Sequence, residues 1–151
     1  MEPELRDAFV PELTLAAAQT IVAEALAHAR REGLKPLAVA VLDSRGAVKV
    51  AAAEDGTSLK RFEVAHGKAY GALALGMGSR AIGKRAEQQP TFVAAVSHVT
   101  GGALVPVPGG VLIISDGRVV GAVGVSGDTS DNDEQAALAG IEASGLAAQT
   151  E

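Results

Sequence analysis

The most informative part of this chain is residues 106–134, PVPGGVLIISDGRVVGAVGVSGDTSDNDE. Two apolar runs, at 111–114 and 119–125, flank the pair Asp116-Gly117. An Asp-Gly pair between apolar runs is a strong signal for a β-hairpin, because glycine accepts the positive φ that a tight turn needs. We therefore expect a buried hairpin, followed by a polar loop and an alanine-rich helix.

The polar loop after this hairpin concentrates four carboxylates within seven residues: Asp128, Asp131, Asp133 and Glu134. A glycine-containing loop before a helix can bind phosphate, but these carboxylates would repel it. The spacing predicts a capping box, with Asp131 as N-cap and Glu134 three residues later. Asp128 and Asp133 are then left over, so the cluster either only caps the helix or also lines a site, with Asp128 and Asp133 as candidate bases or metal ligands.

Apolar periodicity and turn residues predict the remaining elements. We expect a helix at 14–33 with Thr14 as N-cap, strands at 37–43 and 47–53, a helix from a cap at Thr57 or Ser58 to about Met77, helical pieces at 79–98 broken near Gln89-Pro90, a strand or extended segment at 103–107, and a final helix at 131–148. Adjacent antiparallel hairpins covered by helices make an α+β sandwich.

The second predicted helix is apolar on two sides. One face carries Leu59, Phe62, His66, Ala69, Tyr70, Leu73 and Met77. Gly67 and Gly71 lie on the other side and cost about 1 kcal/mol each relative to alanine, which indicates that another backbone packs close to them. A helix with two apolar sides is buried on both. We expect it between the sheet and a second helix or subunit, and we expect the chain to form at least a symmetric dimer.

The composition allows a buried core and excludes several classes of site. The 151 residues fit one domain, with 1–12 as an N-terminal extension, and 48% are hydrophobic although only 3% are aromatic. Because the chain has no cysteine, it forms no disulfide, thiolate nucleophile, iron–sulfur cluster or Cys-type zinc site. A net charge of -5 without a basic stripe argues against a nucleic-acid partner.

Neither a membrane span nor a secretion signal is predicted. No apolar run approaches the roughly 20 residues that a spanning helix needs. The first residues, MEPELRDAF, lack the basic and apolar regions of a signal peptide. The expectation is a cytoplasmic protein with no membrane partner.

Several short motifs along the chain occur in an order and spacing that resemble one family. They are LTLAAAQTIVAEAL at 13–26, AVAVLDSRGAVKVAA at 38–52, EDG at 54–56, KAYGAL at 68–73, PVPGGV at 106–111 and VGAVGVSG at 120–127. Together they resemble the GlcG/HbpS-like family, which includes the PduO C-terminal-like domain, over roughly 13–148. The resemblance implies a profilin-like five-stranded antiparallel sheet packed between helices. Members include haem binders, a domain attached to some corrinoid adenosyltransferases, and aromatic hydroxylamine lyases.

His66 is the first candidate for chemistry. It lies one helical turn from Phe62 and one from Tyr70, and imidazoles serve as general acids or bases because they titrate near neutrality. The alternative is a packed histidine with one hydrogen bond. The resemblance implies a ligand pocket against this helix, in which Phe62, His66 and Tyr70 bind the ligand and His66 is an axial haem ligand or moves protons.

Three further residues have both a functional and a structural interpretation. Glu63 offers a carboxylate for catalysis or a metal, although a carboxylate in the first turn also interacts favourably with the helix dipole. Arg80 can bind a ligand carboxylate or a haem propionate through two parallel hydrogen bonds, or simply begin a solvated helix. His98 suits either the rim of a pocket or a surface helix end. The three histidines are too far apart in sequence for a local metal motif, so any metal is unknown.

Three functions remain open from these observations. The first is a pocket protein that binds haem, or another flat aromatic ligand, in an oligomer. The second is a hydroxylamine-lyase-like enzyme acting on a small aromatic substrate, with His66 and a carboxylate, Glu63 or Asp128, moving protons. The third is a structural or regulatory subunit without a ligand. The scarcity of aromatic residues argues mildly against the first, and the lack of an obvious nucleophile or metal triad argues mildly against the second.

Overall fold

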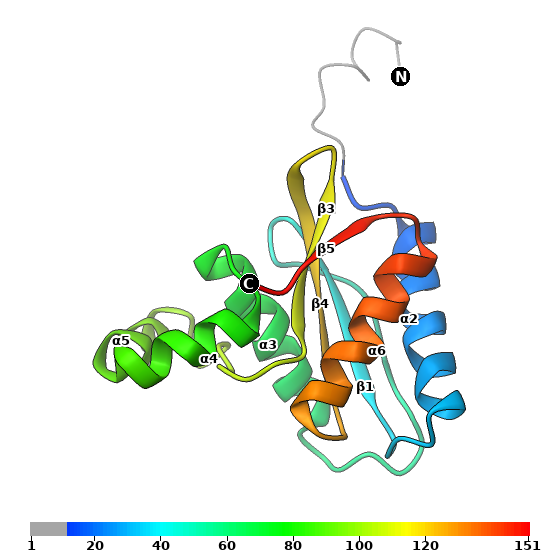
Figure 1. The fold of residues 1–151 in the computed structure, drawn as a ribbon, viewed down its shortest axis with the longest axis horizontal. Coiled ribbons are helices and arrows are strands. Elements are labelled where there is room, and N and C mark those ends of the chain that lie inside the picture. Colours follow the sequence, from blue (N-terminus) through cyan, green and yellow to red (C-terminus); the bar gives the residue numbers. More distant parts are fainter. Residues whose placement is uncertain (1–11) are drawn as a thin grey trace, which may run out of the picture.

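A computed structural model describes residues 12–151 of the chain (Figure 1). The elements are α2 Leu15–Arg31, β1 Ala38–Asp43, β2 Val48–Ala53, α3 Arg61–Leu75, α4 Ser79–Gln88, α5 Pro90–Val99, β3 Gly110–Ser115, β4 Arg118–Ser126, α6 Ser130–Ala143 and β5 Ala147–Gln149. They form an α+β fold, so the predicted five-stranded antiparallel sheet between helices is confirmed. The predicted N-terminal extension lies outside the described residues, except for residue 12.

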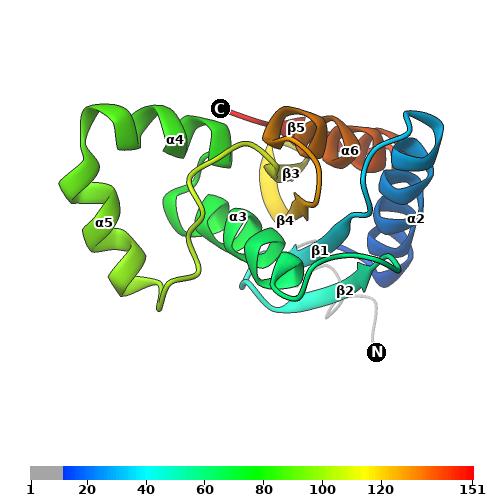
Figure 2. The same cartoon turned by 90° about the horizontal axis from the view of Figure 1, so that it is seen from below.

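The sheet has the order β2-β1-β4-β3-β5, and every neighbouring pair is antiparallel. The predicted hairpin is β3–β4, and Asp116 and Gly117 make its turn with φ angles of 50° and 74°. Figure 2 shows α2 and α6 on one face of the sheet and α3 on the other. The larger hydrophobic core lies between the sheet and the α2–α6 pair.

Helix α3 sits unusually close to the sheet, mainly over β4. A Cβ atom on Gly124 of β4 would lie 1.8 Å from the main-chain oxygen of Ala65 and 3.1 Å from the Cβ of Ala69. Small residues on both surfaces therefore set the distance between helix and sheet. The face of α3 that meets the sheet is buried and consists of Ala65, Lys68, Ala69 and Ala72.

The glycine notch of α3 is filled by the chain itself. Residues Leu104 and Val105 cross Gly71 and Gly67, and the amide of Val105 donates to the carbonyl oxygen of Gly67 at 3.1 Å. The expectation of a close backbone is thus confirmed. The expectation that a second helix or subunit occupies this notch is wrong, because the 103–107 segment runs there as an extended connection.

The fifth strand lies at the C-terminus rather than at 103–107. Helix α6 ends at Ala143, and the chain turns at Gly145 into β5, which pairs with β3 through Leu112 and Gln149. The prediction of one helix over 131–148 is therefore too long. The three residues of this strand are exposed and carry little apolar signal, so the sequence does not mark the end of the helix.

Helix starts agree only partly with the predicted caps. Thr14 caps α2, and its hydroxyl accepts from the amide of Ala17 at 3.1 Å. Neither Thr57 nor Ser58 caps α3, whose N-cap position is Lys60. The predicted break at Gln89-Pro90 is confirmed, because it separates α4 from α5. Within residues 12–151, no helix has the length and apolar character needed to cross a membrane.

The close contact between α3 and β4 gives a first prediction. Gly124→Ala should lower the free energy of unfolding by about 1–3 kcal/mol or more, because the new methyl group meets rigid backbone. Gly67→Ala should cost less, since its Cβ would meet the end of the Val105 side chain at 2.7 Å and alanine favours the helix. Urea denaturation measures both, and equal stability of Gly124→Ala and the parent chain would contradict the packing.

Candidate functional site

Strand β2 is left uncovered on the α3 side of the sheet. Ala38 and Ala40 of β1 pack under Ala65 of α3, and their partners on β2 are Ala53 and Ala51. Directly paired residues point to the same face of a sheet, so Ala51 and Ala53 also face the α3 side, where both are exposed. We call the resulting surface the β2 ledge, and it consists of Val48, Ala51 and Ala53.

A row of three rings on α3 stands beside this ledge. The ring centres of Phe62 and His66 are 6.0 Å apart, and those of His66 and Tyr70 are 5.5 Å apart with an interplanar angle of 25°. These separations are typical of interacting aromatic pairs. The Tyr70 ring lies against Gly46 in the β1–β2 turn. We call this row the ring ladder; it collects the single tyrosine and one of the three phenylalanines of the chain.

The ring ladder faces β2 because the other flank of α3 is occupied. Leu104 and Val105 cover Gly71 and Gly67 on the side that leads into β3. The opposite flank therefore points toward β1 and β2, as the arrangement in Figure 2 also shows. The site is an open surface rather than an enclosed cavity. A cavity of about 160 Å³ lies at the Tyr70 end and is lined by Ser44, Arg45, Gly46, Tyr70, Leu73 and Ala74.

His66 is half-buried in the ladder and has no hydrogen-bond partner among the described residues. Glu63, one turn before it, is exposed and lies 3.9 Å from the ammonium group of Lys60. No contact within residues 12–151 joins His66 to a carboxylate. The structure therefore offers an available imidazole between two rings, without a positioned carboxylate to share its proton.

Arg80 is held by α6 rather than by the ladder. Its Nε lies 3.1 Å from Oε2 of Glu134, and its Nη2 also contacts Asp131. These two carboxylates raise the pKa of Arg80 above its usual value. The predicted capping box is wrong, because Thr129 is the N-cap of α6 and its hydroxyl accepts from the amide of Asn132 at 3.2 Å. Glu134 pairs with Arg80 instead of reaching back to the cap.

Asp128 ties two loops together. Its carboxylate accepts hydrogen bonds from the amides of Lys35 and Thr129 and from the side chain of Asn132, each at 2.8 Å. These donors lower the pKa of Asp128 to about 2, with the Lys35 amide as the largest cause. The oxygens are thus committed to holding the α2–β1 loop against the start of α6, and the group is ionised at neutral pH.

Lys68 and Asp133 form a buried ion pair that sequence reasoning missed. The Lys68 Nζ donates to Oδ2 of Asp133 at 3.0 Å and to the carbonyl oxygen of Val125 at 2.9 Å, and each side chain of the pair is 2% exposed. Burial lowers the pKa of Lys68 and raises the pKa of Asp133, while their mutual attraction opposes both shifts. The sequence shows a single lysine in the apolar part of α3 and a distant cluster of four acidic residues. No local spacing indicates which of these acids pairs with the lysine.

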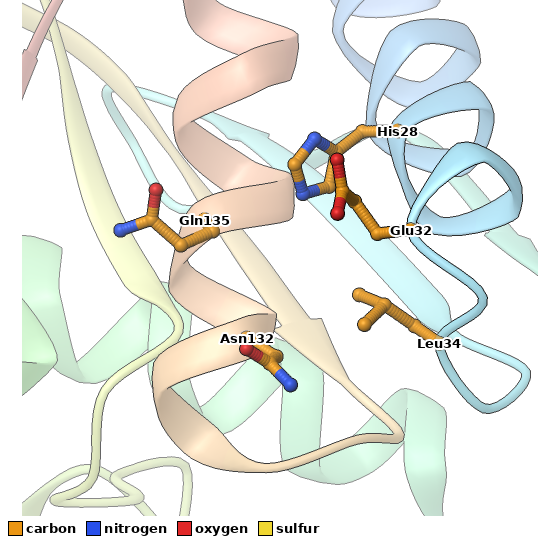
Figure 3. Close-up of a pocket in the computed structure, with 5 residues that line it drawn as sticks. All are labelled: His28, Glu32, Leu34, Asn132 and Gln135. Carbon is orange, nitrogen blue, oxygen red and sulfur yellow. The ribbon is translucent and has the colours of Figure 1, made fainter.

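The remaining histidines lie away from the ladder. His98 is exposed near the end of α5. His28 lines an open depression of about 390 Å³ between α2 and α6, where Glu32 points toward the same space (Figure 3). No three histidine or carboxylate side chains of residues 12–151 are arranged to hold a metal ion. The structure thus brings Phe62, His66 and Tyr70 together, and it places Arg80, His98 and Asp128 in other surroundings.

Comparison with known protein families identifies this architecture. The family described as "Haem degrading protein HbpS-like" matches residues 13–142. The chain belongs to the HbpS-like family. A comparison with curated protein sequences gives no significant match.

Solved structures show the same fold. A double mutant of Streptomyces reticuli HbpS is 30% identical with a TM-score of 0.78, and the match covers 89% of this chain and 88% of that one. Klebsiella pneumoniae protein ORFY is 25% identical with a TM-score of 0.82, covering 91% and 93%. A PduOC:heme complex is 22% identical with a TM-score of 0.82, covering 91% and 98%. At that identity the last match supports the fold alone.

The role of Asp128 predicts a pH-dependent stability. Asp128→Ala should destabilise the chain, because three donors lose their acceptor, and Asp128→Asn should be milder. The folded pKa of about 2 lies below the ordinary value of 3.8, so the carboxylate stabilises the fold above about pH 4 and loses this effect as the pH falls toward 2. In urea denaturation, the difference in free energy of unfolding between the parent chain and Asp128→Asn should shrink as the pH is lowered from 7 to 3. A difference that stays constant would contradict this role.

The buried pair predicts strong coupling between α3 and α6. Lys68→Met should cost about 3–5 kcal/mol of stability, because it leaves a buried carboxylate without its partner. Adding Asp133→Asn should recover part of the loss, since the amide is neutral and keeps an oxygen for the amide of Asp128. A double-mutant cycle in urea measures the coupling, and additive losses would show that the two side chains do not depend on each other.

Proposed function

We propose that this chain binds a flat, largely apolar ligand of the haem type on the β2 ledge, beside the ring ladder. The observation that carries the proposal is the half-buried His66, which stands between two rings above an apolar floor and has no hydrogen-bond partner among the described residues. The family description names haem degradation, and a neighbour of the same fold was solved with heme. The family description supports the choice of ligand class, and the neighbour solved with heme shows only that the fold is shared.

The residues of the ledge fit such a ligand. A neutral imidazole nitrogen is a common axial ligand of haem iron, and aromatic rings provide flat contact area. The alanines of the floor allow a ring system to lie close to the sheet. Arg45 lies at the Tyr70 end, where its side chain is 76% exposed beside Asp43. We assign the contact with an anionic edge to Arg45, because it has one carboxylate partner, Asp43 at 3.1 Å, and remains 76% exposed, whereas Arg80 is paired with both Glu134 and Asp131 and is 31% exposed.

Each residue then has a separate task. Bound haem would supply an iron centre that accepts the His66 nitrogen. Phe62 and Tyr70 restrict the rotation of the imidazole and exclude water from its two sides. The β2 ledge supplies apolar area, and burial of such area contributes about 25 cal/mol per Å². Because the ledge is open, one chain covers only one side of a flat ligand, and we include self-association in the proposed function.

A catalytic role of the hydroxylamine-lyase type finds less support. Such a role requires a proton carrier within hydrogen-bonding reach of its partner, and His66 contacts no carboxylate within residues 12–151. Asp128 is saturated with donors in another loop. A subunit without a ligand is the alternative that the hemin titration below distinguishes.

Hemin titration tests the proposal. The parent chain should shift the Soret band at micromolar hemin, and His66→Ala should weaken binding at least tenfold or change the band, since a lost axial ligand is worth more than about 1.4 kcal/mol. His28→Ala and His98→Ala serve as matched controls and should titrate like the parent. If His28→Ala or His98→Ala loses hemin binding while His66→Ala binds like the parent, the ligand binds at that other histidine and not at His66. Absence of any hemin binding would favour a ligand-free subunit.

A further inference from the structure

We propose that Arg61, the first residue of α3, binds an oxyanion together with the hydroxyl group of Ser58, while the buried Ser126 holds the guanidinium in place. The Nε of Arg61 donates to Oγ of Ser58 at 3.1 Å, and its Nη1 donates to Oγ of Ser126 at 3.2 Å. The oxyanion is a carboxylate or a phosphate group, because these groups match the planar donor set of arginine. The site uses no residue of the ring ladder other than its neighbour in sequence, so it does not depend on the proposed function.

The guanidinium of Arg61 has no carboxylate partner among the described residues. Arg61 is half-buried, and none of the ion pairs within residues 12–151 includes it. Arg30, Arg45 and Arg80, by contrast, each lie within 3.1 Å of a carboxylate oxygen. Removing a charge from water is costly unless a partner compensates for it. A half-buried arginine that is held only by hydroxyl groups therefore favours an anion from solution.

A second cation adds to this excess of positive charge. Burial lowers the pKa of Lys68, Asp133 opposes this shift, and the positive charge of Arg61 lowers the pKa further. The carboxylate of Asp133 is buried against Lys68 at 3.0 Å. Glu63, which follows Arg61 by two positions, lies 3.9 Å from the ammonium group of Lys60. These two carboxylates are thus paired with other cations and leave the charge of Arg61 uncompensated.

The unused donors of this cluster lie on Arg61 and Ser58. The Nη2 of Arg61 makes no hydrogen bond within residues 12–151. Ser58 is exposed, and its hydroxyl accepts from Arg61 without donating to any described residue, although a hydroxyl carries one hydrogen to donate. Ser126 is 0% exposed, so it positions Nη1 and does not meet the ligand. Arg61 and Ser58 together offer charged and neutral donors that an oxyanion can satisfy.

The register of the sheet places this guanidinium at one end of the β2 ledge. Ser126 pairs with Ala38 of β1, and Ala38 pairs with Ala53 of β2. Directly paired residues point to the same face of a sheet, so Arg61 stands over the row that ends at Ala53. Arg45 lies beyond the other end of β2, and a strand of six residues is about 17 Å long. One small anion therefore cannot contact both arginines, and the two sites are separate.

Anion titration tests the site on the parent chain without hemin. Sodium phosphate and sodium acetate are added at an ionic strength held constant with sodium chloride, and NMR follows the backbone amides of residues 57–61. At least one of the two anions should move these signals until they saturate, and the tighter of the two identifies the group as phosphate or carboxylate. Signals that neither anion moves, or shifts that sodium chloride alone reproduces, would overturn the proposal.

Two substitutions of Arg61 separate a shaped site from a simple charge. Arg61→Gln should weaken binding about tenfold or more, and Arg61→Lys should weaken it about threefold or more, because lysine keeps the charge but loses the planar fork. Arg118 is exposed on β4 and forms no ion pair within residues 12–151, so Arg118→Gln is the matched control and should bind like the parent. Equal binding by Arg61→Gln and Arg118→Gln would overturn the site.

The positioning role of Ser126 has its own pair of variants. Ser126→Ala should weaken anion binding severalfold, because the guanidinium loses the acceptor that orients it, and Ser126→Thr should retain binding, because it keeps a hydroxyl. The same NMR titration measures both. If Ser126→Ala binds the anion as tightly as the parent, Ser126 does not position Arg61.

Hemin distinguishes the two sources of the anionic group. If bound hemin abolishes the response of residues 57–61, the group at Arg61 belongs to the ledge ligand; if the response persists, a separate small anion binds there. Saturable phosphate or acetate binding in a chain that binds no hemin would leave the anion site standing and end the haem proposal. Hemin binding without any response to either anion would do the reverse.

Discussion

The close seat of α3 on β4 is the constraint on which the rest of this structure depends. Gly124 has no side chain, and Ala65 above it has only a methyl group, so the helix backbone approaches the strand more closely than any larger residue permits. A helix seated this deeply over β4 does not reach across β2. The bare β2 ledge is therefore a consequence of how the helix packs.

The buried pair of Lys68 and Asp133 fixes the same helix along its axis. Removing two charges from water is costly unless they meet each other and further hydrogen-bonding groups. Here the ammonium group also donates to Val125, and the carboxylate also accepts from Asp128. The pair connects helices that cover opposite faces of the sheet. The acidic loop thus serves mainly to hold α6 against α3 and α4. Its carboxylates are largely occupied by hydrogen-bond and ion-pair partners in this chain.

Local signals predicted the parts of the fold that local chemistry controls. Asp116-Gly117 identified the central hairpin because a turn depends on its own residues, and Thr14 identified a helix start for the same reason. Tertiary contacts controlled the rest. Glu134 has the spacing of a capping box, yet a distant arginine competes for it and a different residue, Thr129, takes the cap. Strand β5 is short and exposed, so its place beside β3 has almost no signature in the sequence.

The candidate site also has one part that local sequence signals predict and one part that tertiary contacts control. Helical spacing alone brings Phe62, His66 and Tyr70 to one flank of α3, so the wall of the site was predictable. Its floor was not, because the exposure of Ala51 follows from the register of β2 on β1 and from the distance between α3 and the sheet. In a chain with so few aromatic residues, a wall of three rings needs a close, flat floor to hold a ring system. Alanines on an uncovered strand provide that floor without filling the space.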